Sequence, residues 1–104
     1  MAVYNRGEVW LTDLGYVGKT RPCLVLSIPA GNRDRALVTM VIHTTALRDS
    51  DFEVDVAADF LKSGAFDVQS IVTVSHAKLL RKLGTLRQDQ LEKVEQAVKD
   101  WLGF

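Results

Sequence analysis

Two short polar segments of the chain carry the side chains best suited to phosphate chemistry. One is the sequence KTRP at residues 19–22, after a glycine-containing loop, and the other is HTT at residues 43–45, ending a β-branched run. A loop-to-strand junction fixes the backbone of Arg21 while its guanidinium reaches outward, and a guanidinium offers two parallel donors to a phosphate. Arg21 could equally pair with a nearby acid, Asp13 or Glu8, and composition alone leaves both interpretations open.

Other familiar catalytic arrangements do not occur in the sequence, which has no P-loop, no GxSxG, no HExxH and no closely spaced histidines. The single cysteine, Cys23, lies in an apolar run, so we expect a buried, inert thiol rather than a nucleophile. Glu53 and Asp55 alternate with apolar residues, and they are better explained as the wet face of a strand than as metal ligands. We therefore expect no metal and no cofactor.

The chain has 104 residues and a formal net charge of zero, with 13 basic and 13 acidic residues. Residues 1–48 hold six basic and three acidic residues, residues 49–70 hold one and six, and residues 71–104 hold six and four. Opposite blocks can fold against each other, or the basic blocks can form a face for an anionic ligand. The length and the 47% hydrophobic content predict a single globular domain over residues 1–104.

Hydrophobic patterning predicts the elements that position the two polar segments. Strands are expected at residues 7–14, 23–26, 36–45, 52–56 and 68–74, a helical turn at 57–62 and a short helix at 75–80. Leu91, Val94 and Val98 recur at helical spacing, which predicts a C-terminal amphipathic helix ended by Gly103. Short antiparallel strands followed by late helices indicate an α+β fold, a small antiparallel β-barrel of about five strands or more.

The order of the motifs along the whole chain resembles that of the MazF/PemK (Kid) toxins. The opening motif is RGEVW at residues 6–10, followed by Asp13 and Leu14, and the second is KTRPCLVL at residues 19–26. The match continues with GN at 31–32, TT at 44–45, Gln69, glycine and leucine at 84 and 86, and the terminal amphipathic helix.

The resemblance implies an SH3-like β-barrel, a homodimer and the toxin of a type II toxin–antitoxin system. It implies metal-independent, sequence-selective cleavage of single-stranded RNA or mRNA, in which the 2′-OH attacks the neighbouring phosphorus. It also implies a cognate antitoxin protein whose acidic, extended tail occupies the RNA groove. No segment of the sequence suits a membrane or a signal peptide, so a cytoplasmic protein is expected.

The resemblance also assigns roles to single residues. Arg21 takes the place of the family's catalytic arginine, and Thr44 falls on the strand-end hydroxyl residue beside it, with Thr45 left open as the alternative. Lys19 and Thr20, which flank Arg21 in its motif, are expected to bind the substrate.

Three further residues are candidates for substrate binding. Gln69 falls on a segment that borders the RNA groove in relatives, and Tyr16, in the loop beside Arg21, is the candidate for stacking on a base. His43 is open between a role at the site, in substrate binding or in acid–base catalysis, and that of a satisfied core histidine.

The general base stays unassigned. Some relatives carry an aspartate directly before the position of Gln69, where this chain has Val68. Asp67 lies one residue earlier, which in a regular strand turns it to the opposite face, so Asp67 as the catalytic base is an open alternative. The loop at residues 15–20 is short and offers neither histidine nor carboxylate. These departures keep an alternative open: a non-nucleolytic interaction protein on the same barrel, either a CcdB-like topoisomerase poison or an inactive antitoxin-binding relic.

Overall fold

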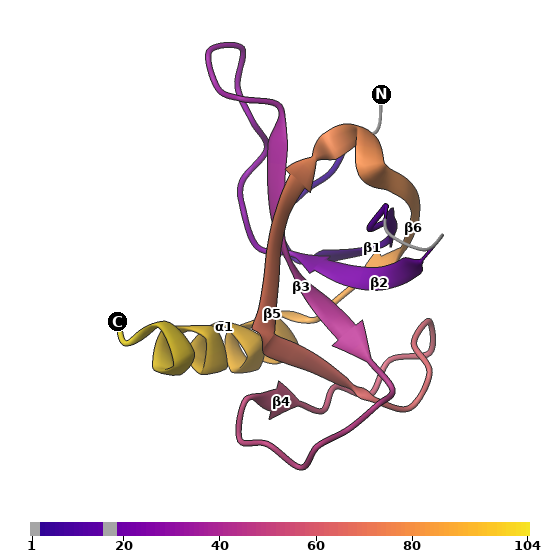
Figure 1. Cartoon of the computed structure of the whole chain (residues 1–104), viewed down its shortest axis with the longest axis vertical. Coiled ribbons are helices and arrows are strands. Elements are labelled where there is room, and N and C mark those ends of the chain that lie inside the picture. The colour runs from indigo at the N-terminus through magenta and orange to yellow at the C-terminus, as the bar shows by residue number, and fades with distance from the viewer. Residues whose placement is uncertain (1–2, 16–18) are drawn as a thin grey trace.

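The computed structural model describes residues 3–15 and 19–104, and within these ranges one sheet of six strands packs against one α-helix (Figure 1). In chain order the elements are β1 (Glu8–Asp13), β2 (Thr20–Val25), β3 (Leu37–Thr44), β4 (Glu53–Val54), β5 (Ala65–Ser75), the 3-10 helix η2 (His76–Lys78), β6 (Leu79–Thr85) and α1 (Gln88–Leu102). The strands lie in the order β4-β5-β3-β2-β1-β6, and each neighbouring pair is antiparallel. The predicted α+β class with an antiparallel sheet is therefore confirmed.

The sheet is open at both edges. β4 and β6 are the edge strands, and in the described part of the chain they do not pair with each other. β4 has two residues and thus offers too few backbone groups to close a sheet on itself. The predicted closure into a barrel is not confirmed.

The predictions between residues 57 and 80 are confirmed only in part. Residues 57–62 contain a turn closed by a hydrogen bond from the Leu61 N–H to the Ala58 carbonyl, but no helix. The short helix predicted at 75–80 is present as the three-residue η2, and Ser75 caps it by accepting a hydrogen bond from the Ala77 N–H at Oγ. The chain then continues as β6, a sixth strand that the patterning did not predict. β6 carries three exposed residues in a row at 80–82, so it lacks the alternation by which a strand is recognised.

β1, β2 and β3 send alternate side chains to opposite faces of the sheet, and each face has its own hydrophobic core. In β2, for example, Leu24 enters the core beneath α1, while Cys23 and Val25 enter the second core with Trp10 and Met40. Burial of each such apolar side chain contributes about 1.5–3 kcal/mol. This alternation fixes the face on which every side chain at the strand ends must lie.

The C-terminal helix confirms its prediction. Leu91 and Val94 are buried in the first core, and the Arg87 N–H is satisfied by Gln90 Oε1 at 3.0 Å. Gly103 adopts a left-handed conformation (φ 82°) and its N–H donates to the Lys99 carbonyl, which ends the helix. In the described residues, no helix is both long and apolar enough to cross a bilayer.

β5 contains a bulge that matters for the site. Val41 lies opposite Ile71, but the next residue, Ile42, lies opposite Asp67, so residues 68–70 of β5 have no partner on β3. The strand turns sharply beside α1 (Figure 1). A bulge of this kind changes which side chains of a strand share one face.

Candidate active site

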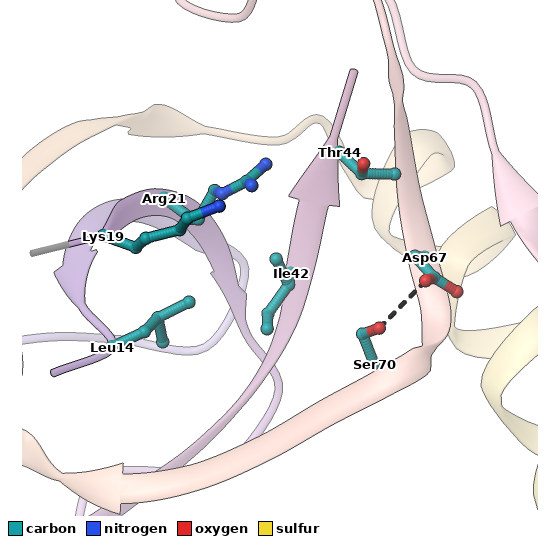
Figure 2. A pocket seen from close by; sticks show the side chains of 7 residues that line it. All are labelled: Leu14, Lys19, Arg21, Ile42, Thr44, Asp67 and Ser70. Carbon is teal, nitrogen blue, oxygen red and sulfur yellow. Dashed lines mark hydrogen bonds between the residues drawn. The ribbon is translucent and has the colours of Figure 1, made fainter. Parts of the chain in front are cut away.

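Arg21 and Thr44 meet at one end of the β2–β3 pair. Cys23 lies opposite Ile42 in this pair, and the same register continued by two residues places Arg21 across from Thr44. Both side chains line a cleft of about 320 Å³, and those of Lys19 and Arg21 extend from the start of β2 toward the end of β3 (Figure 2). The cleft is completed by Leu14, Ile42, Asp67 and Ser70.

The two acids that could have neutralised Arg21 are engaged elsewhere. Glu8 binds Lys82 at 3.0 Å and accepts a hydrogen bond from Trp10 Nε1, and Asp13 lies 4.0 Å from Lys78. Among the described residues, no carboxylate lies within ion-pair distance of the Arg21 guanidinium. A half-exposed guanidinium without an acidic partner is available to an anionic ligand.

Thr44 is arranged as a hydrogen-bond donor toward the cleft. Its Oγ1 accepts from the Ala46 N–H at 3.0 Å, which orients the hydroxyl. A hydroxyl has one proton to donate besides its acceptor sites, so Thr44 can still donate to a phosphoryl oxygen. Thr44 and Thr45 are consecutive, and Thr45 lies in a different cavity, discussed below.

Next to its bulge, β5 supplies the cleft with the carboxylate of Asp67, which the sequence leaves open as a catalytic base. Asp67 Oδ2 accepts a hydrogen bond from Ser70 Oγ at 2.9 Å (Figure 2), and Oδ1 accepts from the Gln69 N–H at 3.0 Å. In a regular strand, residues 67 and 70 would face opposite sides; with residues 68–70 unpaired, both line the cleft. Val68, at the position where relatives carry the acid, is fully buried in the core.

The structure divides the other predicted residues among different places. Lys19 lines the cleft, whereas Thr20 and His43 line the second cavity with Thr45. Gln69 is exposed and lines neither of these two cavities, and its backbone N–H holds Asp67 instead. Tyr16 lies outside the described residues. Within the described ranges, no three histidine, cysteine or acidic side chains gather as a metal site would require.

Comparison with known proteins decides the family. A sequence profile of the PemK-like, MazF-like toxins of type II toxin–antitoxin systems matches residues 5–102. The chain belongs to this family.

Solved structures agree with the PemK/MazF assignment. A mycobacterial endoribonuclease in complex with its cognate antitoxin shares 29% identity, with a TM-score of 0.83 over 98% of this chain and 97% of that one. A second mycobacterial endoribonuclease is 28% identical, with a TM-score of 0.81 over 100% and 95% of the two chains. A MazE–MazF complex from Deinococcus radiodurans is 26% identical, with a TM-score of 0.80 over 100% and 99%. A search of curated proteins gives no significant match.

Two buried groups of this MazF-like toxin complete the electrostatics of the region. Burial raises the pKa of the Cys23 thiol to about 11, so the thiol stays protonated and is no nucleophile. His43 is buried on the face opposite Thr44, with its ring edge-on to Phe66 at 5.1 Å between centroids. Burial lowers the pKa of His43, and its Nε2 has no hydrogen-bond partner among the described residues. His43 is thus buried as a core histidine would be, but its Nε2 is unsatisfied.

Proposed function

We propose that this toxin is an endoribonuclease that cleaves single-stranded RNA without a metal ion, through attack of a 2′-OH on the adjacent phosphorus. The observation that carries the proposal is that three groups line one cleft. They are the guanidinium of Arg21, which has no acidic partner among the described residues, the hydroxyl of Thr44, which can still donate its proton, and the carboxylate of Asp67, which two hydrogen bonds hold in place. The endoribonucleases of similar fold support it.

In the proposed reaction, the 2′-oxygen forms a bond to phosphorus, the bond from phosphorus to the 5′-oxygen breaks, and a cyclic phosphate and a 5′-OH result. The 2′-OH must lose a proton, and a threonine is too weak a base to take it. Asp67 supplies a carboxylate that Ser70 and the Gln69 N–H hold in the cleft, so we assign it as the general base.

Arg21 and Thr44 act on the phosphoryl group in this scheme. The guanidinium neutralises the negative charge that develops on the phosphoryl oxygens, and the Thr44 hydroxyl donates to a non-bridging oxygen. Lys19 adds a second positive charge to the cleft. An ammonium gives up a proton more readily than a guanidinium, so we assign Lys19 as the proton source for the leaving 5′-oxygen.

The partner assignments belong to the same proposal. We propose a cognate antitoxin whose acidic tail binds across Lys19 and Arg21, in keeping with the antitoxin-bound structures of similar fold. We also propose the homodimer, the SH3-like curvature and the cytoplasmic location that the resemblance implies. Exposed apolar side chains, among them Ile28 and Leu80, give a dimer surface to bury.

The deciding experiment is incubation with a long single-stranded RNA in EDTA, comparing the unmodified toxin with Arg21→Ala. We expect cleavage that persists in EDTA, leaves 5′-OH ends and falls about 100-fold or more in the variant, the usual loss for one donor to a developing oxyanion. Arg33→Ala, in the exposed loop between β2 and β3, is the matched control and should cleave normally.

Two results would contradict the proposal. Efficient cutting of a substrate whose target 2′-OH is replaced by hydrogen would exclude the nucleophile. A folded toxin that cuts no RNA but still binds its antitoxin would favour the non-nucleolytic interaction protein instead.

A further inference from the structure

A second cavity, of about 430 Å³, lies across the sheet from the Arg21–Thr44 cleft. Thr44 and Thr45 are consecutive at the end of β3, so their side chains point to opposite faces, and each lines one of the two cavities. Arg21 lines both. An extended ligand that passes over the end of the β2–β3 pair can therefore occupy the two cavities in succession.

The second cavity has an apolar wall held in place by a glycine. Its wall is formed by Leu11, Leu83 and the ring of Phe60. A Cβ atom on Gly84 would collide with the Phe60 ring, so the ring lies directly against the β6 backbone. This close approach gives a physical reason for the glycine in the glycine–leucine motif at 84 and 86, which the proposed reaction does not use.

The rim of the cavity is cationic. Arg21, Lys62 and Arg81 line it, and no carboxylate does. None of the three takes part in an ion pair among the described residues, whereas Arg6, Lys78, Lys82 and Arg87 do. Three unpaired positive charges around one hollow favour an anionic ligand.

A polar group inside the wall points to a ligand with hydrogen-bonding edges. His43 lines the cavity and is 3% exposed, and its Nε2 has no partner among the described residues. Gly64 leaves room for the His43 ring, since a Cβ there would stand 2.8 Å from the His43 Cε1. A flat aromatic surface, cations at the rim and an unsatisfied ring nitrogen together match a nucleotide.

We propose that this cavity is a nucleotide-binding subsite that seats the nucleotide next to the scissile bond, with its base against Phe60 and its phosphate between Lys62 and Arg81. The placement next to the scissile bond rests on the proposed RNA cleavage, whereas the nucleotide chemistry rests on the cavity alone. Because the base contacts the second cavity while the phosphate reacts in the first cleft, the fit of the base in the second cavity contributes to which RNA sequence is cut.

The binding test uses the four nucleoside 5′-monophosphates and inorganic phosphate as probes, titrated into the intact toxin and followed by amide NMR shifts. We expect shifts centred on Phe60, Lys62 and Leu83, and nucleotide affinity above that for phosphate. Phe60→Leu, which keeps an apolar side chain, should weaken nucleotide binding about 10-fold and leave phosphate binding unchanged. Lys62→Ala with Arg81→Ala should weaken both ligands at least 10-fold, and Arg33→Ala should change neither.

The results separate this inference from the proposed function. Equal affinity for phosphate and nucleotides, unchanged binding in the Lys62/Arg81 variant, or shifts confined to Lys19 and Thr44 would overturn the subsite. If the nucleotides bind as expected but the toxin cuts no RNA, the subsite stands and the nuclease proposal fails. If the toxin cuts RNA, Phe60→Leu should alter the set of cut sites, whereas Arg33→Ala, which lies outside both cavities, should leave the cut sites and kcat unchanged. An unaltered set of cut sites would overturn the placement beside the scissile bond.

Discussion

The two cavities at the end of β3 differ most in whether a carboxylate lines them. The cleft around Thr44 combines two cations with Asp67, whereas the cavity around Thr45 combines three cations with an aromatic wall and has no acid among its lining residues. Proton transfer requires an acceptor, while binding of a phosphate requires cations alone. On the functions proposed above, one strand end carries the reacting site on one face and a binding site on the other.

The largest effect should come from removing that carboxylate. Asp67→Asn keeps the shape of the side chain but cannot take the 2′-OH proton, so we expect kcat to fall about 10²–10⁴-fold. KM should change little, because the cations that bind the phosphate remain. The measurement is steady-state cleavage of a labelled RNA; Asp59→Asn, in the exposed turn at residues 57–62, is the control. Wild-type kcat in Asp67→Asn would remove the distinction between the two cavities.

The two consecutive threonines test the same distinction side by side. Thr44→Val should lower kcat at least 10-fold, because the hydroxyl that donates to the phosphoryl oxygen is lost. Thr45→Val should leave kcat within about two-fold, since its side chain lies on the other face. Cleavage by both variants is measured with the same RNA. Equal losses of kcat would show that the two hydroxyls do not have different roles.

The packing of the Phe60 ring against Gly84 should have the next largest effect, which is on the stability of the fold. Gly84→Ala places a methyl against the Phe60 ring, and we expect it to lower the free energy of unfolding by about 1–3 kcal/mol. Each kcal/mol corresponds to about 4–8 °C in Tm for a domain near this size. In a Phe60→Ala background the same substitution should cost far less, because the colliding ring is gone. Additive losses in the double variant, measured by thermal unfolding, would refute the close packing.

The smallest effect separates two neighbours on β6. Lys82 pairs with Glu8, while Arg81 lines the second cavity. Burial opposes ionisation of Glu8, but hydrogen bonds from Trp10 and the Asn5 N–H, together with Lys82, outweigh it and lower the pKa of Glu8 below 4.5. Lys82→Ala should therefore cost up to about 1 kcal/mol of stability, since the pair is partly exposed, and Arg81→Ala should cost none.

The Glu8 contribution has a defined pH window. A lowered folded-state pKa means that the stabilisation is fully present above about pH 4.5 and is lost as the pH falls through the folded-state value. Glu8→Gln should flatten the stability profile in that acidic window. Urea unfolding across pH 3–7 measures it, and an unchanged slope in the variant would contradict the assignment.

The sequence was sufficient where a side chain's face follows from strand alternation. Arg21 and Thr44 each sit at the end of a strand whose core residues alternate, so their meeting in one cleft could be predicted from the motifs and a regular pairing. The terminal helix was equally predictable, because its apolar spacing and Gly103 are local signals.

The rest depended on contacts that no local pattern encodes. Asp67 and Val68 lie on opposite faces, as a two-residue period predicts, but because residues 68–70 bulge away from β3, Asp67 shares the cleft face with Ser70, which no regular period predicts. Phe60 lies in a segment of turns, and its position is set by the distant backbone of Gly84. The open sheet edge at β4 also depends on pairing lengths, which composition does not give.

Cys23 offers a natural probe of local opening around β2, the strand that carries Arg21. The thiol is fully buried two residues from Arg21 on β2, and its Sγ–H lies 3.6 Å from the Arg21 carbonyl oxygen. A thiol reagent can reach it only when the core around this part of β2 opens, and Arg21 lies on the same strand. The rate of Cys23 labelling in native buffer therefore measures how often the packing that holds the Arg21 strand opens. Since the sequence holds no other cysteine, the signal needs no engineered probe.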